Sequence, residues 1–508
     1  MKIEELLLKI DYMSCKIPPK LYKKEILSIC QDSRFANPTC IFVCKVGAIK
    51  DGHVFAPQAY SNGARFFISQ RKLDLPEDAA VIVVEDSEEV LRKLAVYFYG
   101  DHSKDMRLVG ITGTKGKTTV ALSVYNIAAE YGLPVGYIGT NGVYYNGEVF
   151  ETANTTPDCL ELQKILKEMK ENGIVTVILE VSSQALWQKR IYGLSFEICA
   201  FTNLYEDHIG GVEHPTFDHY MDSKRSLFSE YGAKIVVANS DDSHCEYMLK
   251  DAKCEEIVTV SARGNENSSI FAKNVYKTKI GTNPGVAFEI FSGIDSKIPV
   301  YEHGIEAFVP VPGLYSAENA LMTLAISNKL GIPAEFVTEH LSRLKIPGRF
   351  ESVMIKSKPN SLFIIDYAHN GASLIAVLKA LREYEPKRII CLFGSVGGRT
   401  FGRRKELGDA ARDYADISII TSDNPDNEDP LNVIKDIYKS FEGTDKLVYM
   451  ITDRAKAIEK AVEIAEDGDF ILLAGKGHES YQLVSGRRVP FSERDVLENT
   501  DKKNLIYT

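Results

Sequence analysis

Short apolar runs separated by amphipathic stretches recur along most of this 508-residue chain. After Met106 an apolar run, RLVGI, is followed by two helical patterns, TTVALSVYNIAAEYG and ELQKILKEMKENG, and then by a second apolar run, IVTVIL. Such alternation is typical of βαβ units around a mainly parallel sheet. Further runs (SLFIID, RIICLFG, ISIITSD and FILLAG) follow the helical stretch AENALMTLAISNKLG. The pattern therefore predicts an α/β fold.

The length and the pattern together predict three domains, since ordinary domains span about 100–200 residues. Residues 1–104 carry the runs CIFVCKV, ARFFIS and AVIVVE and form a small α/β unit, which ends near the charged stretch DHSKDM. Residues 105–345 form the central unit, and residues 346–508 form the third. Within the central unit, we expect Thr156 to cap the helix that follows it and Pro157 to lie in its first turn.

Composition excludes several classes of protein. Hydrophobic residues at 44% and charged residues at 26% are ordinary for a globular protein. The net charge of -10 provides no basic field for nucleic acid or an anionic membrane. No signal peptide and no apolar run of about 18 residues is found, so we expect a cytoplasmic protein without stable membrane insertion. Nine scattered cysteines are typical of reduced, buried thiols rather than a disulfide framework or a metal pair.

The strongest chemical signal is a glycine-rich segment between an apolar run and a helical pattern. It consists of Gly113, Thr114, Lys115, Gly116, Lys117, Thr118 and Thr119. Such a loop directs backbone N–H groups and a helix N-terminus at phosphate oxygens, while its lysine neutralises charge and its first threonine reaches a magnesium ion. Ile111 stands where the general pattern has its first glycine, so this is a shorter variant. The alternative is a chance glycine turn before a helix.

Three single residues remain ambiguous when they are judged by position alone. Glu180 follows the apolar run IVTVIL, at the strand end where α/β sheets bind ligands, and could hold Mg²⁺. It could equally be a solvated strand-end carboxylate. For His208 and Lys224 the structural alternatives, a satisfied histidine and a solvated helix lysine, are favoured by spacing alone.

An ordered set of nine segments resembles the Mur ligase family of peptidoglycan synthesis. The segments are GTKGKTT, NTTPDCLELQKIL, EVSSQAL, FTNLYEDH, the lysine of YMDSKRSLF, IPGRFE, DYAHN, DNPDNEDP and AGKGHESYQ. The chain is most similar to the MurE type, which adds the third amino acid to UDP-N-acetylmuramoyl-L-alanyl-D-glutamate. The resemblance implies a UDP-binding amino-terminal domain, a central P-loop mononucleotide-binding domain and a carboxyl-terminal Rossmann-like domain that binds the amino acid and closes over the site.

The resemblance also implies roles for particular residues. It places ATP at the glycine-rich segment and at Asn319, Arg349 and Asp366. It places the UDP-muramoyl-dipeptide at Ser33, the segment 51–53, Asn154, Thr155, Thr156, Ser182, Gln188 and Arg190. It places the incoming amino acid at Arg399, Asp423, Asn424, Asp426, Gly475 and Glu479.

The implied chemistry uses ATP and Mg²⁺ to convert a carboxylate into an acyl phosphate, which an amine then attacks. By resemblance, Thr118, Glu180 and His208 bind magnesium, and Lys224 is carbamylated to N6-carboxylysine and assists a metal. Lys117, Glu180, His208 and Lys224 are the implied catalytic set. The partners are small molecules (the muramoyl dipeptide, an amino acid and ATP), and we expect a monomer.

The chain departs from the family pattern near the expected acceptor site. Diaminopimelate-adding members carry DNPR, whose arginine pairs with the distal carboxylate, whereas this chain has Asp426 at that position. An aspartate repels a carboxylate and attracts an ammonium, which favours L-lysine or another diamine. Addition of meso-diaminopimelate is the alternative. Residues 394–400 lack the sequence GGDRD that the family usually has here, so only Arg399 can be matched to a family position.

Two further interpretations compete. A folylpolyglutamate or cyanophycin-type ligase shares the phosphate loop, although the folate enzymes lack the amino-terminal UDP-binding domain that DSR and DGH indicate. The other interpretation is a non-catalytic nucleotide-binding protein, for which we expect metal-binding or carbamate residues to be missing. Thr118, Glu180, His208 and Lys224 are all present.

Overall fold

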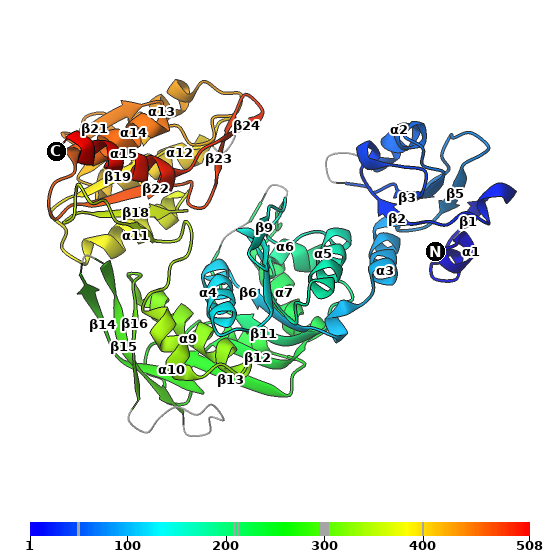
Figure 1. The fold of residues 1–508 in the computed structure, drawn as a ribbon, viewed down its shortest axis with the longest axis horizontal. Coiled ribbons are helices and arrows are strands. Elements are labelled where there is room, and N and C mark those ends of the chain that lie inside the picture. The colour runs from blue at the N-terminus through cyan, green and yellow to red at the C-terminus, as the bar shows by residue number, and fades with distance from the viewer. Residues whose placement is uncertain are drawn as a thin grey trace. The chain divides into compact units, whose positions relative to one another are not determined.

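The computed structural model describes residues 1–47, 51–206, 209–210, 213–281, 283–293, 304–398 and 401–507. The chain folds into two compact units, Met1–Thr259 and Val260–Thr508, which are described separately below (Figure 1). His208 and Arg399 lie outside the described residues. No helix in the described part of the chain is both long enough and apolar enough to cross a membrane.

The first unit begins with a five-stranded sheet. Its order is β1 (Ser14–Lys16), β5 (Ala80–Val83), β4 (Phe66–Ser69), β3 (Cys40–Val43) and β2 (Ser28–Cys30). Only β1 runs antiparallel to its neighbour. The helices are α1 (Ile3–Leu7), α2 (Ala56–Ser61) and α3 (Ser87–Tyr99). Strands β3 and β4 are buried along their whole length, as expected for a parallel sheet covered on both faces.

A second sheet of the first unit positions the candidate site. Its parallel strands are, in order, β12 (Ala233–Asn239), β11 (Phe196–Phe201), β6 (Arg107–Thr112), β10 (Thr176–Glu180) and β7 (Val135–Gly139). Strands β8 (Gly142–Tyr145) and β9 (Glu148–Phe150) extend it antiparallel. The helices are α4 (Lys117–Glu130), α5 (Cys159–Glu171), α6 (Ser183–Trp187), α7 (Phe217–Ser226) and α8 (Cys245–Leu249). Since β6 lies between β10 and β11, the carboxyl ends of these three strands meet at one edge.

The second unit opens with strands of mixed direction. Strand β13 (Glu256–Ser261) includes the point where the first unit ends, and its last two residues pair in parallel with β14 (Ile270–Ile280). Strands β15 (Asn283–Ser292) and β16 (Ile305–Val309) continue this part of the sheet, and β14, β15 and β16 pair antiparallel. Helices α9 (Leu314–Lys329) and α10 (Ala334–Leu341) pack against these strands. Helix α9 is buried on most sides, which explains its nearly continuous apolar sequence.

The rest of the second unit is a six-stranded sheet with helices. Its order is β17 (Glu351–Val353), β18 (Leu362–Asp366), β22 (Phe470–Ala474), β19 (Ile389–Phe393), β20 (Ile417–Thr421) and β21 (Leu447–Ile451), all parallel except β17. The helices are α11 (Gly371–Arg382), α12 (Phe401–Tyr414), α13 (Pro430–Tyr438), α14 (Arg454–Ile464) and α15 (Glu493–Tyr507). A separate hairpin joins β23 (Tyr481–Val484) and β24 (Arg487–Pro490) (Figure 1).

The structure confirms the strands expected at RLVGI, IVTVIL, SLFIID, RIICLFG, ISIITSD and FILLAG and the long helix before residue 331. The expected cap of α5 is wrong. The helix begins two residues later than expected, and its cap is Asp158, whose carboxylate accepts the Glu161 N–H at 3.0 Å. Thr156 is engaged elsewhere, because its hydroxyl donates to the Glu180 carbonyl oxygen at 2.7 Å.

Candidate functional site

The glycine-rich segment forms a tight loop between β6 and α4. At Gly113, φ is 149°, and a Cβ added there would lie 1.9 Å from the Thr202 hydroxyl oxygen, so no other residue fits this backbone. Gly116 adopts φ 83° immediately before Lys117, the first residue of α4. The loop therefore delivers the N–H groups at the start of a helix to the sheet edge, an arrangement suited to phosphate oxygens.

A neighbouring strand end holds this loop in shape. Asn203, just after β11, accepts the Thr114 N–H at its backbone oxygen (2.9 Å) and the Lys115 N–H at its side-chain oxygen (2.8 Å). The Thr202 hydroxyl donates to the Lys115 carbonyl oxygen at 2.7 Å. Sequence reasoning missed Asn203, although the argument applied to Glu180, a polar residue directly after a buried strand, would have found it.

Two lysine side chains contact one carbonyl oxygen of the loop. Lys117 Nζ donates to the Gly113 oxygen at 2.9 Å, and Lys224 Nζ donates to the same oxygen at 2.9 Å. Lys224, on α7, is only 1% exposed and its Nζ lies 4.6 Å from the centre of the Tyr220 ring. A solvated helix lysine is therefore excluded for Lys224. The structure brings it to the phosphate loop, although the two are far apart in sequence.

Glu180 ends β10 and is fully buried. One carboxylate oxygen accepts the Tyr137 hydroxyl at 2.5 Å and the Thr140 N–H at 3.0 Å, and the other accepts the Thr118 hydroxyl at 2.9 Å. Burial, together with the neighbouring Glu180 charge, raises the pKa of the Tyr137 hydroxyl, so it stays a donor. The solvated alternative for Glu180 is excluded. Tyr137, in the middle of β7, and Thr140, directly after this strand, were not found from sequence.

These oxygen atoms fit a hard divalent cation. Mg²⁺ prefers oxygen ligands and is commonly bound by one or two carboxylates together with substrate phosphates and water. Glu180 and the hydroxyls of Thr118 and Thr140 offer such a set, in which the Thr140 hydroxyl lies 3.2 Å from the carboxylate. Within the described ranges no group of three or more histidine, cysteine, aspartate or glutamate side chains gathers to hold a metal. The observed set suits a magnesium ion that is also bound by substrate phosphates.

Most residues implied for the muramoyl peptide surround the end of β10. The Ser182 N–H donates to the Thr156 hydroxyl at 3.1 Å, and Arg190 donates to the Thr156 carbonyl oxygen at 2.8 Å and to Gln188 Oε1 at 2.8 Å. Burial lowers the pKa of the Arg190 guanidinium. Thr155 contacts Thr140 at 3.1 Å between hydroxyl oxygens, whereas Asn154 is exposed. The structure thus brings Thr155, Thr156, Ser182, Gln188 and Arg190 into one region.

A buried histidine joins the elements of this region. His214 is fully buried, with Nε2 lying 2.9 Å from the Ser183 hydroxyl and Nδ1 lying 2.8 Å from His219 Nδ1. Trp187 packs against both imidazole rings, with centroid separations of 5.7 and 5.1 Å. Since Ser183 begins α6 and His219 lies in the first turn of α7, His214 connects the Ser182 segment to the helix that carries Lys224. Sequence reasoning did not identify it.

The implied UDP segments lie in two short 3-10 turns, Ser33–Phe35 and Gly52–Phe55, which follow strands β2 and β3 of the amino-terminal sheet. Ser33 is buried and its hydroxyl donates to Gln58 Oε1 at 2.7 Å. His53 Nδ1 lies 2.6 Å from Asp51 Oδ1. Hydrogen bonds from the backbone and ring of His53 lower the pKa of Asp51 to about 2. The polar side chains of both segments therefore form hydrogen bonds within the amino-terminal domain.

In the second unit, Asp366 lies buried at the carboxyl end of β18. Its carboxylate accepts the N–H groups of Phe350 at 2.7 Å and Ala368 at 2.8 Å. Burial raises the pKa of this carboxyl, opposed by the positive charge of Arg349. Arg349 stacks on Tyr367, its guanidinium carbon 4.9 Å from the ring centre. Asn319 lies on α9 and is half-buried.

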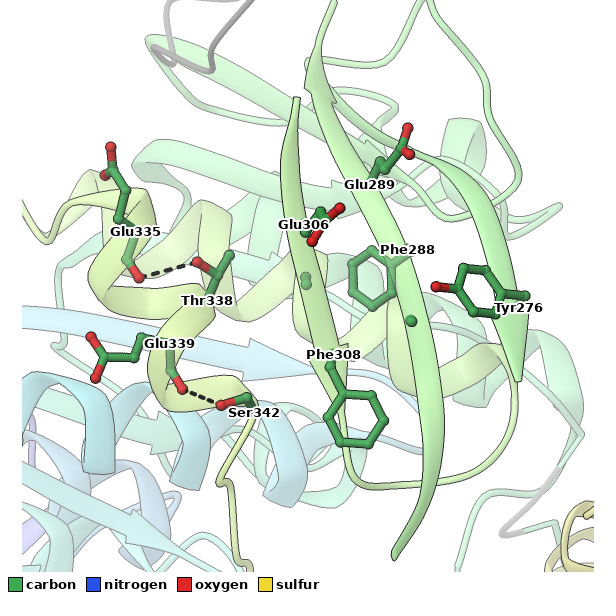
Figure 2. A pocket seen from close by; sticks show the side chains of 11 residues that line it. Tyr276, Phe288, Glu289, Glu306, Phe308, Glu335, Thr338, Glu339 and Ser342 are labelled. Atoms are coloured by element: carbon green, nitrogen blue, oxygen red, sulfur yellow. Dashed lines mark hydrogen bonds between the residues drawn. The ribbon is translucent and has the colours of Figure 1, made fainter. Parts of the chain in front are cut away.

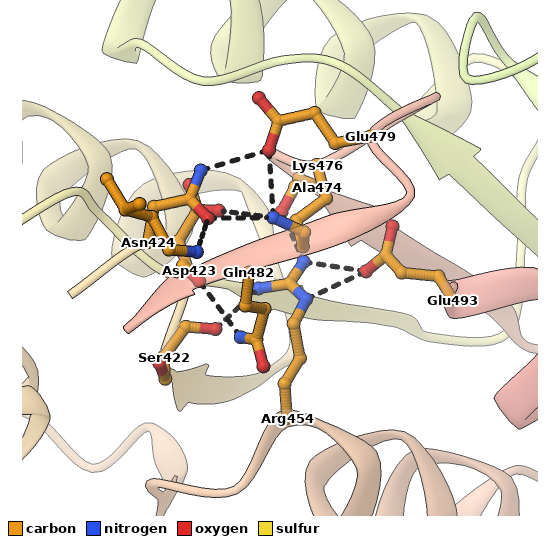
Figure 3. Close-up of polar contacts among 10 residues, drawn as sticks. Ser422, Asp423, Asn424, Arg454, Ala474, Lys476, Glu479, Gln482 and Glu493 are labelled. Carbon is orange, nitrogen blue, oxygen red and sulfur yellow. Dashed lines mark hydrogen bonds and ion pairs between the residues drawn. The ribbon is translucent and has the colours of Figure 1, made fainter. Parts of the chain in front are cut away.

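A cluster around Lys476 gathers most of the residues implied for the acceptor amino acid (Figure 3). The Lys476 ammonium is fully buried and lies 2.8 Å from Glu479 Oε2, 3.1 Å from Asn424 Oδ1 and 3.4 Å from Asp423 Oδ1. Asn424 also donates to Glu479 at 2.9 Å. A Cβ added at Gly475 would meet Asp423 Oδ2 at 3.4 Å. Lys476 was not identified from sequence.

Next to this cluster lies a second buried ion pair (Figure 3). Arg454 contacts Glu493 at 2.7 Å, and the side chains are 0% and 1% exposed. Arg454 also donates to the carbonyl oxygens of Ser422 and Ala474, at 3.1 and 2.9 Å. Burial raises the pKa of Glu493 although Arg454 opposes the shift. The pair fixes the two strand ends, β20 and β22, from which Asp423 and Lys476 extend.

Asp426 has a structural role that the sequence did not suggest. Its φ is 52°, a left-handed conformation that aspartate tolerates better than most residues. Its carboxylate accepts the Gly486 N–H at 2.9 Å, and its own N–H donates to the Leu483 carbonyl oxygen at 2.8 Å. The side chain therefore anchors the hairpin β23–β24.

A cavity of about 420 Å³ lies elsewhere in the second unit, between α10 and the strands β14–β16 (Figure 2). Glutamates line it, including Glu289 and Glu306, which pair across β15 and β16. None of the predicted site residues lines this cavity. Its acidic lining is unsuited to a nucleotide phosphate, so the site is better described by the loop and the cluster above.

Family comparisons cover most of the chain. The Mur ligase middle domain model matches residues 111–327, and the model of the Mur ligase glutamate ligase domain matches residues 348–477. The UDP-N-acetylmuramoyl-L-alanyl-D-glutamate--2,6-diaminopimelate ligase of Clostridium botulinum is 36% identical over 486 residues, which cover 95% of this chain and 96% of that protein.

Solved structures agree with these matches. A structure of UDP-N-acetylmuramoyl-L-alanyl-D-glutamate--2,6-diaminopimelate ligase aligns with a TM-score of 0.66 and 27% identity, covering 99% of each chain. The MurF ligase of Thermotoga maritima, solved in complex with ADP, aligns with a TM-score of 0.59 and 19% identity over 95% of this chain and 99% of that one. The latter likeness concerns the fold alone.

Proposed function

The chain belongs to the Mur ligase family, and from this premise we propose that it joins 2,6-diaminopimelate to UDP-N-acetylmuramoyl-L-alanyl-D-glutamate with consumption of ATP. The protein is a ligase with the three-domain α/β architecture of that family. The observation that carries the acceptor is the 36% identity, over 95% of this chain, to a diaminopimelate ligase. The domain boundaries at residues 104 and 345 stay a prediction.

The comparisons favour diaminopimelate over the lysine preference inferred from Asp426. That inference assumed that the Asp426 carboxylate faces the acceptor. In the structure it accepts a hydrogen bond from Gly486 and stabilises a left-handed turn. Because the Asp426 carboxylate already has a hydrogen-bond partner within the protein, its presence does not indicate a substrate ammonium. It therefore gives no reason to prefer L-lysine over diaminopimelate.

In the first chemical step, the γ-carboxylate of the D-glutamyl residue attacks the γ-phosphorus of ATP. A C–O–P linkage forms, the bond to the β-phosphate oxygen breaks, and ADP leaves. The loop N–H groups and Lys117 balance the charge of the phosphates. Ser182, Gln188 and Arg190 orient the muramoyl peptide beside the end of β10. Glu180 and Thr118 would hold Mg²⁺, which supplies electrostatic stabilisation of the transferring phosphoryl group.

Carbamylation of Lys224 is supported by its contacts. Two cationic lysines that donate to the same Gly113 oxygen repel each other at short range. Lys224 must first lose its ammonium proton; the neutral Nζ then adds to CO₂ and releases a second proton. The product is an anionic carbamate, and the repulsion from Lys117 becomes attraction. We assign Lys224 this modification and place it among the groups that organise the phosphates and the metal.

In the second step, an amine of the acceptor attacks the acyl phosphate carbonyl. The C–N bond forms, the nitrogen loses its proton, and the C–O bond to phosphate breaks. Asp423 and Glu479 offer carboxylate oxygen atoms for the acceptor's ammonium group, and Lys476 and Asn424 hold them in place. Exclusion of water from the acyl phosphate protects it until the amine arrives.

Coupled turnover tests the proposal. Purified protein is given UDP-muramoyl-dipeptide, Mg-ATP and one acceptor at a time (meso-diaminopimelate, L-lysine or no amino acid), and ADP release is followed. We expect the highest kcat/KM with diaminopimelate. A clear preference for L-lysine, or equal rates without any acceptor, would contradict the proposal. Folate substrates in the same assay test the folylpolyglutamate alternative, for which we expect no turnover.

The carbamate has its own test. Lys224→Ala should lose at least about 100-fold in kcat, as expected when a group that stabilises transferring phosphate is removed. Lys234→Ala, on β12, is the control. In ¹³C NMR with labelled bicarbonate, a carbamate signal should be present in the wild type and absent from Lys224→Ala. Full turnover by Lys224→Ala would refute the assignment.

A further inference from the structure

The hairpin β23–β24 is fastened to the loop that carries the acceptor cluster. Five hydrogen bonds make the connection. Leu483 N donates to Asn424 Oδ1, Gln482 Nε2 to the Asp423 carbonyl oxygen and Gly486 N to Asp426 Oδ1, each at 2.9 Å. Asp426 N donates to the Leu483 carbonyl oxygen at 2.8 Å, and Ser485 N donates to the Asp426 carbonyl oxygen at 2.6 Å. The position of the hairpin relative to Asn424 is therefore fixed by backbone as well as side-chain atoms.

This register determines which hairpin side chains share a face. Leu483 pairs with Arg488, and Tyr481 pairs with Pro490, so Tyr481 and Arg488 lie on the same face. The guanidinium carbon of Arg488 lies 4.4 Å from the centre of the Tyr481 ring. Stacking on an aromatic ring restricts the arginine and orients its planar donors. Arg487 lies on the opposite face.

The Tyr481 ring also connects Arg488 to the acceptor cluster. Lys476 Nζ lies 5.8 Å from the centre of the same ring and 2.8 Å from Glu479. Lys476 is fully buried, whereas Arg488 is exposed. The cluster thus presents carboxylate oxygens of Asp423 and Glu479 inside and a guanidinium at its solvent edge. Such an arrangement suits a ligand that carries an ammonium group and, several bonds away, a carboxylate.

We propose that Arg488 recognises the second carboxylate of a diamino dicarboxylate acceptor, an inference that rests on the function proposed above. A guanidinium binds a carboxylate through two parallel hydrogen bonds, which a lone ammonium cannot reproduce. Arg488 contributes this contact from the hairpin, and Asp426 holds the hairpin where the contact is possible. The acceptor is selected over L-lysine because lysine has no second carboxylate to occupy the guanidinium.

Charge reversal at Arg488 tests the proposal. In Arg488→Glu, KM for meso-diaminopimelate should rise at least tenfold, while KM for ATP and for UDP-muramoyl-dipeptide stays within twofold of wild type. The preference for diaminopimelate over L-lysine should fall by at least tenfold. Arg488→Lys should recover part of the affinity. Arg487→Glu makes the same charge change on the opposite face and should leave all three KM values within twofold.

The outcomes separate the two proposals. Wild-type protein that turns over diaminopimelate, combined with an unchanged KM in Arg488→Glu, would overturn the role of Arg488 alone. The same KM rise in Arg487→Glu would also overturn it, since a general charge effect would then be responsible. Wild-type protein that does not use diaminopimelate would overturn the proposed function and the role of Arg488 together. An unchanged thermal midpoint in both variants shows that the hairpin remains folded.

Discussion

The phosphate loop of the first unit and the Lys476 cluster of the second unit are built on different physical principles. The loop consists of neighbouring residues in sequence, and its shape depends on glycine and on backbone N–H groups. The cluster assembles Asp423, Lys476 and Glu493 from three distant segments through buried charges. Backbone dipoles carry no desolvated net charge, whereas buried ions are costly unless paired. We therefore expect the loop to tolerate the loss of a lysine charge structurally, although not the loss of its glycines, and the cluster to be destabilised when one of its charges is removed.

The largest expected effect on stability is at the buried pair beside the cluster. Arg454→Met leaves the Glu493 carboxylate without its cation, which typically costs about 3–5 kcal/mol. Urea unfolding followed by circular dichroism should show an early transition of the second unit. Trp187, the single tryptophan, lies in the first unit, so its fluorescence should keep the wild-type midpoint. The double variant Arg454→Met/Glu493→Leu should recover most of the loss, and failure to do so would contradict the pairing argument.

At the loop, a charge can be removed without loss of the fold. Lys117→Met should lower kcat by roughly 10²–10³-fold, because a preorganised cation at the phosphates is lost. Both unfolding midpoints should match wild type, since the glycines and Asn203 hold the loop. Lys164→Met, at an exposed position of α5, serves as the control for activity. A large stability loss in Lys117→Met would contradict the expectation that the loop, unlike the Lys476 cluster, stays folded when a charge is removed.

His214 combines features of both regions. His214→Ala removes a partner from Ser183 and from His219, and a buried polar group left unpaired typically costs about 1–3 kcal/mol. Because Trp187 packs on both rings, its emission spectrum should change as well. Since the histidine connects the Ser182 segment to the Lys224 helix, kcat should fall while the ATP affinity is largely retained. Wild-type kcat in a folded His214→Ala protein would refute this role.

The smallest effect concerns acid stability. Arg404 donates to Glu428 at 2.6 Å, and this bond, followed by the Gly398 N–H, holds the pKa of Glu428 below its ordinary 4.5. A depressed carboxyl pKa contributes stability that is present above the ordinary value and is lost as the pH falls through the lower, folded value. Glu428→Gln should therefore flatten the decline of second-unit stability below the ordinary pKa of 4.5. An unchanged acid transition would show that the pair contributes nothing there.

Sequence predicted the parallel strands, the long helix α9 and the phosphate loop, because each is encoded by neighbouring residues with a clear period or spacing. It did not predict the hairpins β14–β15 and β23–β24, where apolar alternation is weak and pairing sets the register. Sequence also did not predict the hydrogen bonds of Glu180 with Tyr137 and Thr140, because they connect β10 with the region of β7, which is distant in sequence. For Asp426, the sequence shows the charge of the side chain but not the conformation of the backbone that carries it. A positive φ and a hairpin contact, neither visible in sequence, explain the residue better than substrate charge does.

The close approach between Gly113 and Thr202 limits the order in which this protein could change over generations. A side chain at position 113 would collide with the hydroxyl of Thr202, 1.9 Å away, so the first substitution in any lineage would have to occur at 202. That change in turn removes the hydroxyl that binds the Lys115 carbonyl. Even a residue without a hydroxyl at 202 would leave the Asn203 backbone N and O 3.1 Å from a Cβ at position 113, so glycine is favoured there whatever stands at 202.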